Sequence, residues 1–162
     1  MPLMFTQVKI VGPDDKPMPV TKRGEILVHG PNVTPGYWRL PDATHDAFTL
    51  AGWFRTGDVG YLDEEGYLFI CDRKKDMIIT GGENVYPAEV ESELAAHPDI
   101  AEVAVVGLPD EKWGETPCAF IELIDSSDLT AEDMALWCKQ YMASFKVPRH
   151  FVFQKVFKTS TG

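Results

Sequence analysis

Three short stretches decide how this chain is interpreted: Phe-Arg-Thr-Gly-Asp at residues 54–58, Asp-Arg-Lys-Lys-Asp at residues 72–76, and Gly-Gly-Glu-Asn at residues 81–84. An ionised carboxylate such as that of Asp58 has two acceptor oxygens, which match the vicinal hydroxyls of a ribose. Hydrogen bonds to a charged group contribute roughly 1.5–3 kcal/mol each. The guanidinium of Arg73 carries a fixed fork of donors that reaches either a ribose or a phosphate. These residue types are therefore those that a nucleotide site requires.

The same residues have ordinary structural interpretations when each is taken alone. Asp58 suits a turn or a cap, and Arg73 suits a surface ion pair with a neighbour such as Asp72 or Asp76. Gly81-Gly82 suits an ordinary turn, because a residue without Cβ adopts positive φ freely. Both interpretations stay open at this point.

Length and composition favour a globular chain of one domain or two small ones. A chain of 162 residues buries about 70% of its unfolded surface. Its 44% hydrophobic and 25% charged residues are usual for a soluble protein. The longest apolar stretch, around residues 103–108, is too short to span a bilayer, and residues 1–5 do not have the pattern of a secretory signal.

The cysteines indicate a reducing compartment. Cys71, Cys118 and Cys138 are odd in number and widely spaced, without a Cys-x-x-Cys pair. A disulfide framework or a zinc site is therefore not expected, and each cysteine is interpreted as a small buried hydrophobic residue. A cytoplasmic location follows from this pattern. The four histidines match no nucleophilic or metal-binding constellation, so structural or surface roles are expected for His29, His45, His97 and His150.

The net charge of −10 disfavours nucleic acid and anionic membranes as partners. The distribution of charge is uneven. Residues 83–138 hold fourteen acidic residues and one basic residue, whereas residues 139–162 hold five basic residues and no acidic one. Residues 73–75 form a second basic cluster. Two local cationic clusters on an acidic chain suit a small polyanion such as a nucleotide or CoA, although a solvated charged face gives the same pattern.

Hydrophobic patterning predicts a β-rich first part. We expect strands at residues 6–12, 24–30, 58–62 and 67–72, with a hairpin turn at residues 63–66, and a short helix at residues 41–48 that begins with a proline.

The second part is predicted to be mixed α+β. Its expected strands are residues 77–79, 100–108, 118–124 and 151–153. A helix is expected at residues 87–97, with Val90 and Leu94 on one face. Thr130 and Asp133 form a capping box that opens a helix to about residue 142, and its predicted apolar face holds Met134, Trp137 and Tyr141. A boundary is expected near residues 72–76.

Four stretches, in order, resemble the adenylate-forming family of acyl-CoA synthetases, luciferases and peptide-synthetase adenylation domains. They are residues 24–37, beginning Gly-Glu-Ile; residues 54–58, with Phe for the family's Tyr; residues 72–91; and residues 145–162, with Phe-Lys-Val-Pro followed by Lys-Thr-Ser-Thr-Gly. The chain resembles the C-terminal portion of such an enzyme. Residues 72–87 look more like fatty-acyl-CoA ligases than peptide-synthetase domains.

The resemblance implies an α+β fold in two parts. Residues 1–72 would be the β-rich C-terminal end of a large AMP-binding domain, and residues 73–162 a small α+β lid domain. Lys75 would be the hinge about which the lid rotates, with Lys74 and Asp76 as the adjacent alternatives.

The resemblance also assigns binding roles. Asp58 and Arg73 would bind the ribose of ATP and of the acyl-adenylate, and Asn84 would face the nucleotide in one lid orientation. Gly81 and Gly82 would let the backbone pass close to the pantetheine arm of CoA. The family's catalytic lysine would follow directly after Gly162, so no catalytic residue is assigned within the chain.

The implied reaction has two half-reactions. A carboxylate attacks the α-phosphate of Mg-ATP to give acyl-AMP and pyrophosphate, and the CoA thiol then attacks the acyl group and releases AMP.

A fatty acid is the expected substrate, and an aryl or other carboxylate is the alternative. A different class also stays open, namely a noncatalytic module that binds nucleotide or CoA or takes part in protein interactions. The expected partners are small molecules, together with self-association through strand edges and apolar surface.

The 162-residue chain alone is predicted to lack ligase activity, because the resemblance places the phosphate loop, the acyl pocket and the catalytic lysine outside it. The measurement is carboxylate-dependent release of pyrophosphate from Mg-ATP. Release above the rate of a reaction without carboxylate would contradict this prediction.

Overall fold

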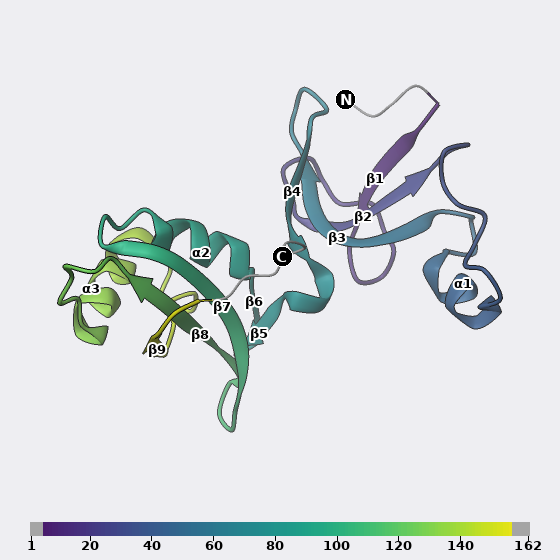
Figure 1. The fold of residues 1–162 in the computed structure, drawn as a ribbon. Helices are drawn as coiled ribbons and strands as arrows, with labels where there is room; N and C mark the ends of the chain where they lie inside the picture. Colours follow the sequence, from purple (N-terminus) through teal and green to yellow (C-terminus); the bar gives the residue numbers. More distant parts are fainter. Residues whose placement is uncertain (1–4, 157–162) are drawn as a thin grey trace. The chain divides into compact units, whose positions relative to one another are not determined.

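The computed structural model of this chain describes residues 5–156, which lie in two compact units divided between Lys75 and Asp76 (Figure 1). The division falls slightly beyond the boundary expected between residues 72 and 73. Each unit has its own sheet and its own core. The α+β fold class expected from the sequence is confirmed.

The first unit, residues 1–75, is built on a four-stranded antiparallel sheet in the order β1-β2-β3-β4. Its strands are β1 (Gln7–Val11), β2 (Gly24–His29), β3 (Phe54–Leu62) and β4 (Leu68–Arg73), and its helix is α1 (Pro41–Ala47). The inner strand β2 is buried on both faces, since the successive residues Glu25, Ile26 and Leu27 are all buried. Strand β3 begins at Phe54 rather than at Asp58 as predicted, because Phe54 pairs with Val28 of β2.

The β3–β4 hairpin was predicted and has a simple local cause. Its turn is stabilised by Asp63, whose Oδ1 accepts hydrogen bonds from the backbone N–H groups of Glu65 at 3.0 Å and Tyr67 at 2.8 Å. Gly66 provides the positive φ of 80° that the turn needs. The turn sets the register of Leu62 with Leu68, and a shift of register between Val59 and Gly60 then brings Asp58 opposite Arg73.

A single 3₁₀ turn, η1 (Lys74–Asp76), follows β4 directly. Sequence patterning did not reveal it, because three consecutive charged residues carry no hydrophobic period. All three residues are exposed. The turn therefore leaves the end of the first sheet without adding to either core.

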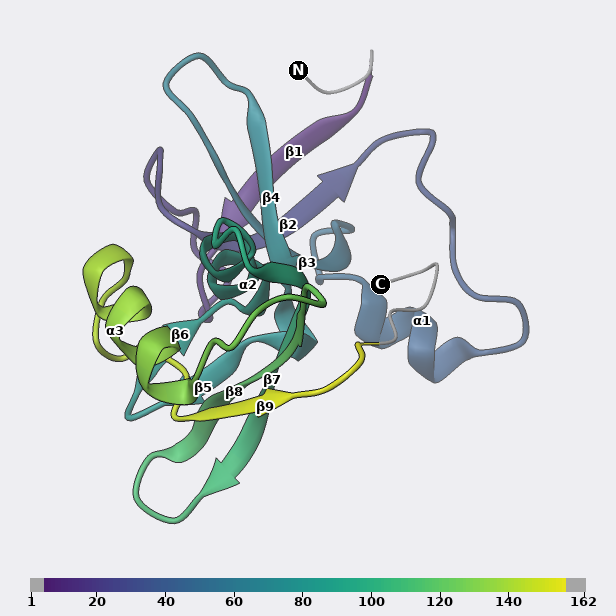
Figure 2. The ribbon, with the colours of Figure 1, turned by 60° about the vertical axis from the view of Figure 1, so that its left-hand side comes forward.

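The second unit, residues 76–162, is a five-stranded sheet with two helices (Figure 2). Strands β6 (Glu83–Val85), β5 (Ile78–Thr80), β8 (Gly114–Leu123) and β7 (Ile100–Asp110) lie in that order, and β9 (His150–Phe153) pairs in parallel with β8. Helices α2 (Pro87–Ala95) and α3 (Ala131–Tyr141) share one core with the sheet. Strand β6 was not predicted, because two of its three residues are Glu83 and Asn84, which are residue types depleted in strands.

The core of the second unit confirms the predicted face of α2. Val90 and Leu94 are buried, one turn apart, against β7 and β8. The predicted capping box of α3 is also present: the Thr130 hydroxyl accepts from the Asp133 N–H at 3.3 Å, and Asp133 accepts from the Thr130 N–H at 3.1 Å. This cap fixes where α3 begins.

The predicted apolar face of α3 needs a correction. Its buried residues are Met134 and Cys138, one helical turn apart, and Trp137 is only partly buried beside them. Tyr141 is 53% exposed and contacts the Trp137 ring with a centroid distance of 4.5 Å. Cys138 is small, so the sequence pattern gave more weight to the larger aromatic residue at the edge of the face.

We expect Leu94→Ala to destabilise the second unit by about 2–5 kcal/mol, because it removes a fully buried side chain and leaves a cavity. The measurement is urea denaturation followed by circular dichroism and by the total tryptophan fluorescence. The control is Leu136→Ala on α3, where the side chain is 59% exposed, with an expected change within about 0.5 kcal/mol. Equal losses in the two variants would contradict the assignment of Leu94 to the core.

Candidate functional site

The two residues expected to hold a ribose lie side by side in the first unit. Asp58 of β3 and Arg73 of β4 are register partners in the antiparallel pair. The Arg73 Nε lies 3.6 Å from Asp58 Oδ1, so the two side chains form an ion pair. Asp58 keeps 32% of its side chain accessible and Arg73 keeps 65%. Sequence reasoning offered Asp72 or Asp76 as the ion-pair partner of Arg73, whereas the structure pairs it with Asp58.

The backbone before Asp58 turns sharply, and the sequence provides for the turn. Gly57 has a φ of 74°, in the left-handed region that favours glycine. The Thr56 hydroxyl donates to the carbonyl of Ile26 at 2.8 Å and accepts from the Asp58 N–H at 3.1 Å. One hydroxyl thereby fixes the turn to strand β2 and fixes Asp58 to the turn.

A shallow depression of about 360 Å³ adjoins this pair. It is lined by Thr56, Gly57, Arg73, Lys74 and Lys75. Three consecutive cations at its rim make it a favourable place for a small anion, since opposite charges attract more strongly beside a protein surface than in bulk water. A depression beside a carboxylate and three cations can therefore hold a hydroxylated ligand that carries a phosphate.

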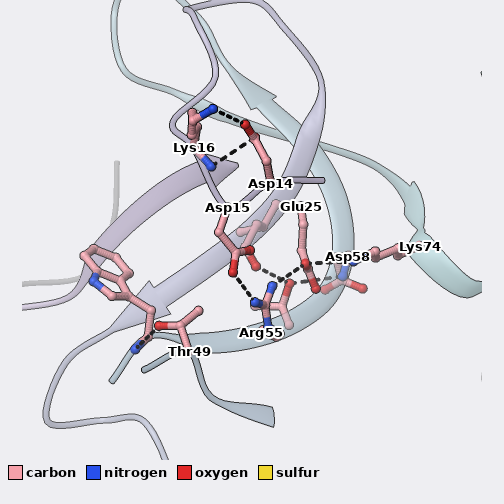
Figure 3. Close-up of polar contacts among 11 residues, drawn as sticks. Asp14, Asp15, Lys16, Glu25, Thr49, Arg55, Asp58 and Lys74 are labelled. Carbon is pink, nitrogen blue, oxygen red and sulfur yellow. Dashed lines mark hydrogen bonds and ion pairs between the residues drawn. The ribbon is translucent and has the colours of Figure 1, made fainter. Parts of the chain in front are cut away.

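A network of charged residues connects Lys74, which lines the depression, with strand β2 (Figure 3). Glu25 of β2 is 8% exposed, and its Oε2 lies 3.0 Å from Nη1 of Arg55 and 3.0 Å from Nζ of Lys74. Arg55 also reaches Asp15, with 2.5 Å between Nη2 and Oδ2. The hydrogen bond from Arg55 lowers the pKa of Asp15, and the bond to Asp15 raises the pKa of Arg55 above its usual value.

Sequence reasoning missed the role of Glu25. Glu25 belongs to the Gly-Glu-Ile stretch that resembles the family, but no role was predicted for its side chain. The available signal was an acid within an apolar strand, because a buried carboxylate requires a partner of opposite charge. That partner was not identifiable from spacing, since Arg55 and Lys74 lie 30 and 49 residues away.

The residues expected to face CoA and the nucleotide from the lid lie together in the second unit. Gly81 and Gly82 form the two-residue turn of the β5–β6 hairpin, with φ values of 59° and 86°. Two successive positive φ values are typical of the type I′ turn, in which glycine is favoured. Asn84 follows in β6, exposed and paired with Ile79.

Gly81 also meets a tryptophan that sequence reasoning did not single out. A Cβ on Gly81 would lie 2.7 Å from Cε3 of Trp113, and the Gly81 N–H donates to the Trp113 carbonyl at 2.9 Å. The indole ring carries Lys112 Nζ at 4.7 Å and Arg149 Cζ at 4.9 Å from its centroid. The hairpin turn therefore packs against an aromatic ring with two cations beside it.

The remaining candidate residues have simple placements. Lys75, the expected hinge, is the last residue of the first unit and lies exposed within η1. Lys146, in the Phe-Lys-Val-Pro stretch, pairs with Glu89 at 2.6 Å between Nζ and Oε1. The stretch at residues 158–162 lies outside the described residues. The hinge, ribose and CoA assignments stay predictions at this point.

Two of the three cysteines are buried as expected, whereas Cys71 is only half-buried, and two of the histidines pack on tryptophan rings. His29 packs on Trp53 and His97 on Trp137. Cys118 and Cys138 are buried, and desolvation raises the pKa of the Cys138 thiol to about 11, so this thiol stays protonated at neutral pH.

Within residues 5–156 no group of histidine, cysteine and acidic residues is arranged to hold a metal ion. No helix in that part of the chain is long and apolar enough to cross a membrane.

Comparison with known proteins gives a consistent result. Residues 89–162 match the family described as AMP-binding enzyme C-terminal domain. The chain is 47% identical over 152 residues to a 2-succinylbenzoate–CoA ligase of Bacillus mycoides (strain KBAB4), and 44% identical over 153 residues to a feruloyl-CoA synthase of an Amycolatopsis species. Each alignment covers 94% of this chain and 31% of the relative. The chain thus spans about a third of the length of these relatives.

Solved structures agree with the sequence comparison. ATP-bound MatB from Rhodopseudomonas palustris superposes with a TM-score of 0.91 at 37% identity, over 98% of this chain and 32% of that one. The o-succinylbenzoate CoA synthetase MenE of Bacillus subtilis, in complex with the acyl-adenylate OSB-AMP, superposes with a TM-score of 0.85 at 42% identity, over 94% and 31% of the two chains. Residues 89–162 thus form an AMP-binding enzyme C-terminal domain, and the relatives of the chain named above are CoA ligases.

We expect Gly81→Ala to destabilise the second unit more than Gly82→Ala. Both substitutions force a left-handed backbone on alanine, at a cost of about 1–2 kcal/mol. Only the Gly81 variant also brings Cβ within 2.7 Å of the Trp113 ring, whereas nothing lies within 4 Å of a Cβ at Gly82. Urea denaturation of the two variants measures the difference. Identical losses would show that Trp113 moves aside without cost.

Proposed function

We propose that the protein carrying this chain is an ATP-dependent acid–thiol ligase. It joins a carboxylate to CoA through an acyl-adenylate and releases pyrophosphate and AMP. The observation that carries the proposal is the Asp58–Arg73 pair beside a cationic depression, at 3.6 Å between Nε and Oδ1. Relationship to CoA ligases over 94% of the chain supports it.

In this proposal Asp58 and Arg73 orient the nucleotide. The accessible carboxylate of Asp58 accepts hydrogen bonds from the two ribose hydroxyls, and Arg73 donates to the same sugar. The pair is formed before the ligand arrives, so less conformational freedom is lost when the nucleotide binds. ATP enters with Mg²⁺ as a complex, and CoA is the second substrate. Holding the ribose places the α-phosphate for attack by the carboxylate.

The second unit supplies the lid. Lys75 is the proposed hinge, and its place at the end of the first unit supports the assignment. A lid that presents a different face in each half-reaction requires such a hinge. Asn84 faces the nucleotide in one orientation, and the backbone at Gly81 and Gly82 lies along the pantetheine arm of CoA. The absence of Cβ at these two glycines supports a close approach to the ligand.

The acid substrate is proposed to be an aromatic carboxylate. The fatty acid expected from residues 72–87 has less support, because the relatives named above act on 2-succinylbenzoate and ferulate by their names. The chain covers about a third of those relatives, so an assay of the full-length gene product determines which acid is the substrate.

The experiment measures pyrophosphate release by the full-length gene product with Mg-ATP and a panel of benzoates, cinnamates and fatty acids, with and without CoA. Turnover of aromatic acids, with thioester formed only when CoA is present, is the expected result. Turnover of fatty acids alone would keep the ligase and overturn the substrate class. No turnover with any carboxylate would overturn the ligase and favour a noncatalytic binding module.

Within that enzyme, Asp58→Asn is expected to lower kcat/KM for ATP by roughly tenfold or more, since a hydrogen bond to a charged group contributes about 1.5–3 kcal/mol and 1.4 kcal/mol corresponds to a factor of ten. The matched control is Asp42→Asn in the exposed helix α1, with kcat/KM unchanged. An Asp58→Asn enzyme with normal kcat/KM for ATP would remove Asp58 from the nucleotide site.

A further inference from the structure

Glu25 is a buried carboxylate to which the proposed reaction assigns no part. It lies on the central strand β2, and its Oε2 accepts from Arg55 and from Lys74, each at 3.0 Å. Burying an ion is costly unless its partners compensate for the lost water. A polar residue at this place in a buried strand therefore needs a reason beyond the stability of the core.

The two cations that Glu25 binds flank the candidate ribose pair along the chain. Arg55 lies three residues before Asp58, on the same strand β3. Lys74 follows Arg73 directly, at the first position of η1. Glu25 thus contacts strand β3 through Arg55 and the residue that follows β4 through Lys74. Both contacts are close in sequence to Asp58 and Arg73, which lie opposite each other.

Ile26, the residue after Glu25, also connects strand β2 with the turn before Asp58. The Ile26 carbonyl accepts from the Thr56 hydroxyl at 2.8 Å, and that hydroxyl accepts from the Asp58 N–H at 3.1 Å. Two successive residues of β2 thereby reach the Asp58 turn and the start of η1. Figure 3 shows Glu25 between Arg55 and Lys74. The β2 pairing with β3 also shifts register between Glu25 and Leu27, so the strand is irregular at this point.

We propose that Glu25 is a positioning residue for the nucleotide site: its carboxylate holds Lys74, which fixes the backbone that follows Arg73 and so keeps the Arg73 guanidinium on Asp58. Glu25 does not line the depression, whereas Lys74 does. Its effect on a bound nucleotide therefore passes through Lys74. The effect on nucleotide binding rests on the function proposed above. The structural part, in which Glu25 and Lys74 keep Arg73 on Asp58, is independent of that function.

The structural part is tested on the 162-residue chain by nuclear magnetic resonance. Arg73 Nε lies 3.6 Å from Asp58 Oδ1, so exchange of the Nε proton with water is used as the readout of this ion pair. We expect Glu25→Gln and Lys74→Met to speed that exchange severalfold, and Lys74→Arg to keep it slow. The control is Asp14→Asn, which breaks an exposed ion pair with Lys16 in the turn that also carries Asp15. Exchange at Arg73 that is unchanged in Glu25→Gln and Lys74→Met would overturn the proposal.

Lys74→Met keeps this test decisive if Glu25→Gln fails to fold. The Lys74 side chain is 54% exposed, so its replacement leaves the core intact, and Glu25 keeps Arg55 as a partner. Circular dichroism checks that each variant has the wild-type fold.

The functional part is a double-mutant cycle in the full-length enzyme, measured as KM for ATP and as kcat. We expect Glu25→Gln and Lys74→Met each to raise KM for ATP about tenfold with a smaller change in kcat, and the double variant to be no worse than either single one, because residues in one network are not additive. Additive effects would show that Glu25 does not act through Lys74. Unchanged Arg73 exchange tells against the positioning role, whereas wild-type enzyme without ATP turnover tells against the proposed function alone.

Discussion

The antiparallel pairing of β3 with β4 is the constraint on which the candidate site depends. The pairing places residues 58 and 73 opposite each other although fifteen residues separate them along the chain. Opposite residues of an antiparallel pair have Cβ atoms about 4.5–5.5 Å apart, within reach of an ion pair between an acid and an arginine. A slip of one residue in the hairpin would turn one of these side chains to the other face of the sheet. The Asp63 turn and the register shift between Val59 and Gly60 together bring the two charged residues opposite each other, so both belong to the structure of the site.

Two kinds of support hold the pair in place. Glycine at position 57 accepts a left-handed backbone, and the Thr56 hydroxyl ties the turn to β2. Behind them the Glu25 carboxylate satisfies two cations at once. The strands carry the site, and buried polar contacts orient it. Rigid elements hold functional groups more accurately than loops do, because the sheet hydrogen bonds limit their movement.

Local patterns in the sequence were sufficient to predict much of this fold. The α2 face with Val90 and Leu94, the capping box of Thr130 and the β3–β4 hairpin all depend on neighbours within a few residues, and all are present. Strand β6 and the 3₁₀ turn were missed because their residues are mostly polar or charged and carry no hydrophobic pattern. In the candidate site, Asp58 and Arg73 were named from residue chemistry and family resemblance, and the structure placed them together. The Glu25 network and the approach of Trp113 to Gly81 depend on contacts between distant residues, which spacing along the chain does not reveal.

The parallel pairing of β9 with β8 has a consequence for synthesis on the ribosome. Every other strand pair in the second unit is antiparallel among residues 76–156, and β9 is the last of the strands described there to emerge. Phe151 of β9 lies beside Ala119 and packs on the core, so the core is incomplete until residue 151 has left the exit tunnel. A nascent chain that has produced β5 to β8 and α3 still exposes apolar surface where β9 will lie. The second unit therefore completes its folding late in translation, and a nascent chain stalled before β9 is a target for chaperones and proteases.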